Sequence, residues 1–198
     1  MHWFIAQAKE WSAKDGIANA FGMVLHTDRH SNTAHVLNDE SFWRGLDERS
    51  GQRWPVFAMR AIPGKTVTPS ARPGDLSLMV AVYREPKENK EILDALGLDS
   101  SERPYLVVCS LLNDEEMLVQ SVALSEESVE AAHKALKEGL DAATTAIEDL
   151  TPERIKSAQS VYNAVELTFT DLKHKRLIKK AVPLLGLLKK LLSQVSAP

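Results

Sequence analysis

Three closely spaced histidines are the residues whose types most resemble a metal site. His26, His30 and His35 lie in the stretch HTDRHSNTAH, with Asp28 between the first two. Imidazole nitrogens and a carboxylate are ligands that zinc accepts. Catalytic zinc sites usually hold their ligands on a helix or strand of defined register, whereas this stretch is predicted to be a strand end followed by a loop. Two hypotheses follow: a metal-dependent enzyme that uses this loop, or, favoured by the loose spacing, a polar loop with scattered histidines.

Cys109 is the single cysteine of the chain and lies in the apolar run LVVCSLL. Such a run predicts a central strand, in which a cysteine behaves as a small apolar side chain with a raised pKa. One cysteine excludes an internal disulfide and a cysteine metal cluster, and it fits a reducing compartment. We therefore expect Cys109 to be buried and inert.

The motifs of the common enzyme classes are absent from the chain. Gly64, Lys65 and Thr66 resemble the end of a phosphate-binding loop, but Met59 stands where that loop needs glycine. A proline follows at Pro69, so no helix N-terminus is predicted to face a phosphate. No G-x-S-x-G, H-E-x-x-H or G-x-G-x-x-G is present. We expect no cofactor and no nucleotide site.

The elements that would position these residues alternate between strand and helix patterns. Apolar runs predict strands at 21–27, 55–62, 76–83, 105–112 and 116–124, the last two forming a hairpin. Helices are predicted at 38–51, with Asn38 as its cap, and at 85–99, with Gly97 as its stop. Because the strand runs are nearly continuous in apolar residues, we expect a sheet covered on both faces.

Helical periodicity dominates the last third of the chain. The apolar stripe of a long helix consists of Val129, Ala132, Leu136, Leu140, Ala143, Ile147 and Leu150. A second helix starts at Thr151 and Pro152, and its stripe consists of Ile155, Ala158, Tyr162, Val165, Phe169 and Leu172. The pattern predicts an N-terminal helix at 1–17, an α/β domain at 18–150 and a helical extension at 151–198.

The segment ERPYLVVCSLLNDEEMLVQSVALSEESVEAAHKAL resembles the second half of a thioredoxin-like domain. In that family a proline precedes the third core strand, a β-hairpin follows and a helix closes the fold. The resemblance covers roughly residues 20–150, and it implies that Pro104 is the matching proline, with a cis peptide bond by analogy. The chain departs from the family in having no C-x-x-C and in having two strands at 55–84 where fewer are needed. Dithiol redox chemistry is therefore not implied.

The C-terminal tail has a charge opposite to that of the rest of the chain. Residues 172–198 contain seven basic and no acidic residues, so with a net charge of −3 for the whole chain the first 171 residues carry −10. The periodicity predicts a helix over 173–195, interrupted near Pro183 and Gly186, with a leucine face and a lysine face. The expected interaction residues are Leu177, Ile178, Leu184, Leu185, Leu188, Leu191, Leu192, Lys179, Lys180, Lys189 and Lys190.

Three hypotheses account for this tail. It packs on protein, either on its own chain or on a second copy; it lies in the headgroup plane of an anionic membrane; or it binds a separate acidic partner. Nucleic acid is not expected, because the basic residues alternate with leucines rather than aromatics and the remainder of the chain is acidic. No apolar run is long enough to span a bilayer, and no signal peptide is evident.

The sequence as a whole favours a non-catalytic interaction or assembly protein. We expect a cytoplasmic homo-oligomer, or a protein with a protein partner, that uses its helical C-terminal extension for contacts. The alternatives are peripheral membrane association through the basic amphipathic tail and a metal-dependent enzyme built on His26, His30 and His35.

Overall fold

The computed structural model describes residues 9–10, 12–49, 53–59, 79–82, 89–99, 103–113, 116–170, 172, 175–176 and 181–183. The strands are β1 (Ala20–Leu25), β2 (Val56–Met59), β3 (Met79–Val82), β4 (Tyr105–Leu111), β5 (Glu116–Ala123), β6 (Lys175–Arg176) and β7 (Ala181–Pro183). The helices are α2 (Ser31–Asn38), α3 (Glu40–Arg49), α4 (Asn89–Ala95), α5 (Val129–Glu148), α6 (Pro152–Ile155) and α7 (Ala158–Thr170). The predicted α/β class is confirmed.

The strands form one mixed sheet in the order β3-β2-β1-β4-β5-β6, with β7 also paired to β5. Strands β1, β2 and β3 run parallel to one another, whereas β4 is antiparallel to β1 and to β5. Each of the five strands predicted in the first 124 residues is present within the described part of the chain. The predicted β4–β5 hairpin closes with Leu112 N–H donating to the Glu116 carbonyl at 3.0 Å.

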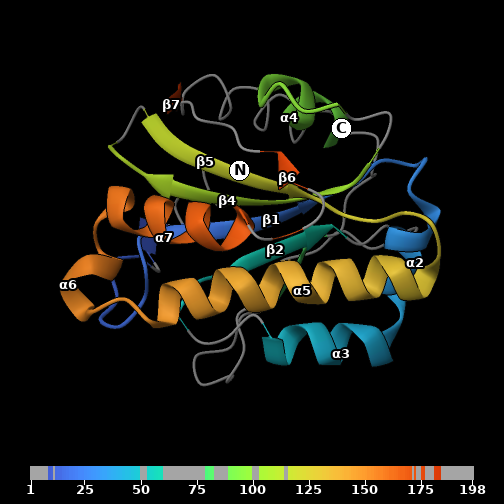
Figure 1. Cartoon of the computed structure of the whole chain (residues 1–198), viewed down its shortest axis with the longest axis horizontal. Helices are drawn as coiled ribbons and strands as arrows, with labels where there is room; N and C mark the ends of the chain where they lie inside the picture. Colours follow the sequence, from blue (N-terminus) through green and yellow to red (C-terminus); the bar gives the residue numbers. More distant parts are fainter. Residues whose placement is uncertain are drawn as a thin grey trace, which may run out of the picture.

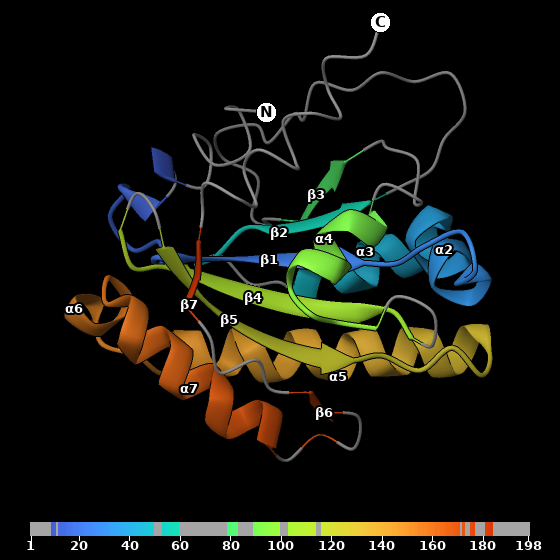
Figure 2. The same ribbon diagram turned by 90° about the horizontal axis from the view of Figure 1, so that it is seen from above.

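Apolar side chains cover both faces of the sheet, as the continuous strand runs predict. On one face, α4 packs Ile92, Leu93 and Leu96 against residues of β1, β4 and β5. The opposite face is covered by α2, α3, α5, α6 and α7 in one larger apolar cluster. Figure 1 shows α5 running along this face with α7 beside it, and Figure 2 shows both helices on the same side of β4 and β5. Among the described residues, no helix has the length and apolar content needed to cross a lipid bilayer.

Pro104 lies immediately before β4, between the hairpin partner β5 and the central strand β1. It is buried, and its carbonyl accepts the Leu124 N–H at 2.8 Å. No described peptide bond is cis, so the cis bond expected at Pro104 by analogy is wrong. The expectation that Pro104 starts a central strand is confirmed.

The stretch predicted to be a histidine-bearing loop contains a helix. Residues Ser31–Asn38 form α2, and His35 lies on it. Asn38 is the last residue of α2 and does not cap the next helix; Asp39 does so instead, because its carboxylate accepts the Ser41 N–H at 2.8 Å. The hydrogen bonds from the Ser41 hydroxyl and then from the Ser41 N–H hold the pKa of the Asp39 carboxyl below its ordinary value. The sequence pattern therefore misplaces the end of α2 and the start of α3.

The apolar stripe of the long C-terminal helix is buried in α5 from Ala132 to Ile147, while Val129 is half-buried and Leu150 lies just after the helix; α5 begins at the Ser128 cap. The second helix is not continuous, because it is divided into α6 and α7 at Lys156 and Ser157. Lys156 ends α6, and its ammonium donates to the Ser12 carbonyl at 2.7 Å. The apolar residues of both helices join the same core as α5, so the core continues beyond residue 150.

The two predicted helices at the chain ends are only partly within the described residues. Of the N-terminal helix predicted over 1–17, residues 9, 10 and 12 are helical, residues 13–17 form turns, a bend and irregular structure and not helix, and residues 1–8 and 11 lie outside the described residues. Of the C-terminal helix over 173–195, residues 175–176 and 181–183 are strands that pair antiparallel with β5. At these five residues the helix prediction is wrong, because pairing with the outer edge of β5 overrides the helical pattern.

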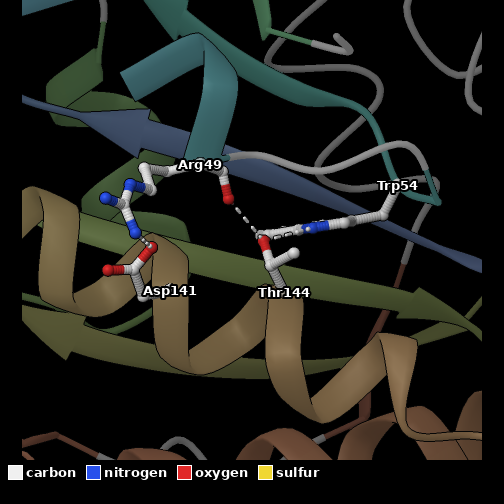
Figure 3. A network of polar contacts seen from close by, with 4 residues as sticks. All are labelled: Arg49, Trp54, Asp141 and Thr144. Carbon is white, nitrogen blue, oxygen red and sulfur yellow. Dashed lines mark hydrogen bonds and ion pairs between the residues drawn. The ribbon is translucent and has the colours of Figure 1, made fainter. Parts of the chain in front are cut away.

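Trp54 joins three elements in the larger apolar cluster. Its indole N–H donates to Thr144 Oγ1 of α5 at 3.1 Å, and Thr144 Oγ1–H donates to the Arg49 carbonyl at the end of α3 at 2.9 Å (Figure 3). Arg49 and Asp141 add an exposed ion pair at 3.4 Å. The ring of Trp54 lies against Gly22 of β1, where a Cβ would be 2.5 Å from Cζ3. The start of β2 is thus fixed to β1, α3 and α5.

A pair of glycine substitutions tests this packing. Gly22→Ala should lower the free energy of unfolding by about 1–3 kcal/mol, because the new methyl group displaces the indole. Gly45→Ala in α3 should raise it by roughly 0.5–1 kcal/mol, because no heavy atom lies within 4 Å of the added Cβ and alanine favours helix. Urea denaturation of both variants measures the difference. Equal effects of the two substitutions would contradict the close contact at Gly22.

Candidate functional site

The turn between β1 and α2 holds the two predicted histidines that the structure brings together. His26 is 1% exposed and His30 is 2% exposed, and Thr27 between them is also buried. They follow directly after β1, whose six residues are all buried, so the turn enters the interior at the end of a central strand. Asp28 and Arg29 of the same turn are exposed. The turn is thus a buried polar cluster next to the start of α2.

Glu126, from the loop between β5 and α5, occupies the N-terminus of α2. Its carboxylate accepts the Asn32 N–H at 2.6 Å and the Thr33 hydroxyl at 2.6 Å. The Thr33 N–H also points to it, and the Asn32 side-chain amide donates to the Glu126 carbonyl at 2.9 Å. A carboxylate in a partly buried position at a helix N-terminus stabilises by roughly 1–2 kcal/mol, since it satisfies unpaired amides and opposes the helix dipole. A carboxylate of the protein itself therefore occupies the position at the first turn of α2 where an anion would bind.

The hydrogen bonds of His30 determine which of its nitrogens carries the proton. The Thr27 N–H donates to His30 Nδ1 at 2.9 Å, so Nδ1 is an acceptor and the proton of the neutral ring is on Nε2. Nε2 is buried and has no hydrogen-bond partner within the described part of the chain. Burial lowers the pKa of His30 from its ordinary value, against a smaller opposing effect of the Glu126 carboxylate. The neutral form is favoured.

His35 lies apart from the other two histidines. It is exposed on α2, and its ring meets the edge of Phe42 with ring centroids 6.5 Å apart. Phe42 in turn lies against His133 of α5 at 4.6 Å. Among the residues that the structure describes, no group of three or more histidine, cysteine, aspartate or glutamate side chains is arranged to hold a metal ion. The predicted His26, His30 and His35 site does not form in the described structure.

Gln120 is a second buried polar side chain with unpaired atoms. It lies on β5 opposite Val108 and is 1% exposed, and neither its amide nitrogen nor its amide oxygen has a hydrogen-bond partner in the portion of the chain that the structure describes. An orphaned buried amide costs about 1–3 kcal/mol. Its strand partner is apolar and the amide is not reactive, so Gln120 by itself indicates no chemistry.

Cys109 is fully buried in β4, as predicted. Its side chain belongs to the apolar cluster beneath α4, and burial raises the pKa of the thiol far above its usual range. A thiol held protonated in an apolar core is neither a nucleophile nor a metal ligand. The other predicted site residues lie in the C-terminal tail: Leu177, Ile178, Leu184, Leu185, Leu188, Leu191, Leu192, Lys179, Lys180, Lys189 and Lys190 fall outside the described residues.

Sequence reasoning missed Glu126 and the helix that it caps. The hydrogen bond between Asn32 and Glu126 joins residues 94 positions apart, and His30, the local cap residue, makes no side-chain capping bond. The cap position itself is occupied by His30, which is not one of the usual capping residues, so the local pattern does not mark a helix start there. The polar residue that completes α2 is supplied by the fold.

Comparisons of the chain with protein-family models, with curated proteins and with solved structures found no significant match.

Thiol labelling tests the state of Cys109. A thiol reagent should react slowly with the native protein and rapidly in denaturant, because the thiolate is scarce and covered. Glu127→Cys, at an exposed position in the loop before α5, is the matched control and should add one rapidly reacting thiol. Rapid modification of Cys109 in the native wild-type protein would contradict the burial of this residue.

Proposed function

We propose that this chain is a non-catalytic interaction or assembly protein built on a thioredoxin-like domain. Three features support the domain assignment: Pro104 precedes β4, β4 and β5 form a hairpin, and α5 follows it. These are the features on which the resemblance to the thioredoxin-like family depends. β3 extends the sheet beyond β2 and lies outside that pattern.

The polar cluster at α2 supports a role without catalysis. A helix N-terminus activates a nucleophile or binds an anion through its unpaired amides and partial positive charge. Here the Glu126 carboxylate already accepts the Asn32 and Thr33 amides. The chain has one cysteine, and it is buried in β4 away from the solvent. The start of α2 is thus arranged for stability rather than for reaction.

The observation that carries the proposal is the pairing of the C-terminal segment with β5. Lys175 and Arg176 pair with Val122 and Ser121, and β7 pairs with Glu116–Leu118. Edge strands expose unpaired amides and carbonyls, and they recruit further strands by main-chain hydrogen bonds. Residues 175–176 and 181–183 lie at the β5 edge of their own chain, and we propose that the same edge accepts these residues from a second copy.

The register of the two short strands differs. From Leu118 to Ser121 β5 advances three positions, whereas from Arg176 to Ala181 the C-terminal segment advances five. Because the difference of two is even, residues of β6 and β7 keep the same alternation between the two sheet faces. Pro183 ends β7 and lacks an N–H, which limits the addition of a further strand outside it. The segment is therefore better suited to close the edge of the sheet than to be followed by further strands.

The charge distribution favours a protein partner over nucleic acid. The tail carries seven basic residues, and the preceding 171 residues carry −10. Opposite charges on the two parts favour contact between the tail and a body of this chain, either its own or a second copy's. The described segment pairs with β5 of its own chain, and the same pairing made with β5 of a second copy would join two chains, so we propose a homo-oligomer.

Removal of residues 173–198 tests this function. The truncated protein should have a smaller oligomeric state in light scattering, or a lower solubility, because β5 loses its outer partners. The backbone amides of β5 should exchange with deuterium faster than in the full chain. The matched control is Lys179→Glu together with Lys180→Glu, which changes the charge of the tail and keeps its length.

Vesicle binding distinguishes the membrane hypothesis from the assembly proposal. If the truncated protein keeps the assembly, stability and solubility of the full chain, while the full chain binds phosphatidylserine vesicles in a salt-sensitive way, the tail is a membrane anchor and the assembly proposal is wrong. In that case the two lysine substitutions should reduce vesicle binding and leave the oligomeric state unchanged.

A further inference from the structure

The β1–α2 turn buries an imidazole whose surroundings favour the neutral ring. His30 is 2% exposed, its Nδ1 accepts the Thr27 N–H at 2.9 Å, and its Nε2 has no hydrogen-bond partner among the described residues. An imidazolium donates from both nitrogens and accepts at neither. Protonation therefore removes the hydrogen bond from the Thr27 N–H and leaves Nε2–H without an acceptor among the described residues. The Thr27 hydroxyl lies 3.4 Å from Nδ1, too far for a strong bond to the new donor.

The charged groups that act on His30 come from two elements. Glu126, from the β5–α5 loop, and Asp28, from the turn itself, attract an imidazolium, whereas His26 and Arg29 of the turn oppose it. Of the two carboxylates, Glu126 has the larger effect. Its oxygens are already occupied by the Asn32 N–H and the Thr33 hydroxyl. A protonated His30 can take up the Glu126 carboxylate only at the expense of the first turn of α2.

We propose that the β1–α2 turn is a proton-operated latch, closed while His30 is neutral and opened when His30 is protonated. In the closed form Thr27 N–H is bonded to His30, and Glu126 holds the Asn32 and Thr33 amides. In the open form the bond from Thr27 is lost and Glu126 is drawn from the start of α2, which frees that helix N-terminus. The latch is independent of the function proposed for the C-terminal segment.

The direction of the pH dependence follows from the burial of the ring. The closed turn binds a proton at His30 less readily than the open turn does, because the pKa of the buried ring is below its ordinary value of 6.5. The open form consequently binds more protons as the pH falls, and the closed form loses stability. The stabilisation is fully present above pH 6.5 and is lost as the pH falls below it.

Amide hydrogen exchange of the full-length protein, followed by NMR, tests the latch. Protection factors of the Thr27, Asn32 and Thr33 amides should fall between about pH 7.5 and pH 5, by up to about tenfold for each pH unit below the ordinary pKa of 6.5, until the lower pKa of the buried ring is reached. Protection factors, rather than raw rates, are compared because the intrinsic exchange rate itself changes with pH. Amides in the middle of β4 should show no such change and serve as the internal reference.

Two variants identify the titrating group. His30→Asn places an amide oxygen where Nδ1 accepts and cannot be protonated in this range, so the protection at Thr27 should become independent of pH. His35→Asn changes the exposed histidine of the same helix and should retain the wild-type pH dependence. Glu126→Gln keeps an acceptor but removes the attracting charge, so the transition should move to lower pH.

The outcomes that overturn the latch are specific. One is a wild-type protein whose Thr27, Asn32 and Thr33 protection is constant over this pH range. Another is a His30→Asn variant that keeps the wild-type response, with His26→Asn losing it, since His26 would then be the sensor. If His30→Asn does not fold, the wild-type imidazole resonances decide: protonation of His30 without a concurrent change at the Thr27 amide contradicts the proposal.

Discussion

The hydrogen bond from the Trp54 indole to Thr144 is the constraint on which the arrangement of the larger core depends. A buried indole N–H must find an acceptor, and here the acceptor is a hydroxyl on α5 that donates onward to the end of α3. The indole ring reaches this position because Gly22 has no Cβ in its way. The direction of α5 along the sheet is thereby set near its C-terminal end. The loop that enters its N-terminal end carries Glu126, so the cap of α2 depends on where α5 lies.

The buried polar groups near the two ends of α5 therefore differ in whether all of them have hydrogen-bond partners. At Thr144 every polar group of the small network has a partner, which favours a single arrangement. At the β1–α2 turn, the Glu126 carboxylate accepts hydrogen bonds from Asn32 and Thr33, while Nε2 of His30 has no hydrogen-bond partner among the described residues. An unpaired buried donor is a cost that the remaining fold must offset, and such costs concentrate at places that respond to a change of conditions. The end of α5 near Thr144 is held in one arrangement, whereas the turn near its other end can change with pH. This difference provides a physical basis for the proposed latch.

The sequence was informative where a short segment determines its own environment. Nearly continuous apolar runs predicted β1, β4 and β5, and helical spacing predicted the apolar stripe of α5, because these elements are set by their own apolar residues. Gly97 has a positive φ of 67° after α4, as expected of a helix stop. The start of α2 could not be predicted, because its anchoring carboxylate comes from a residue 94 positions away. The histidine cluster was found from the sequence, but its meaning was not, since His35 faces Phe42 and only His26 and His30 share the turn.

Residues 175–176 and 181–183 pair with the outer edge of β5, and we propose that this C-terminal segment supplies the assembly contact. Its most direct test is oxidative cross-linking of Leu118→Cys with Ala181→Cys, since the two residues are paired in the antiparallel register and cross-strand pairs have the separation that a disulfide requires. Leu118→Cys with Val182→Cys is the matched control, one residue out of register. The account predicts a rapid disulfide for the first pair and none for the second, within one chain or, in the oligomer, between two chains on a non-reducing gel. Absence of cross-linking in the first pair, or equal cross-linking in both, would contradict it.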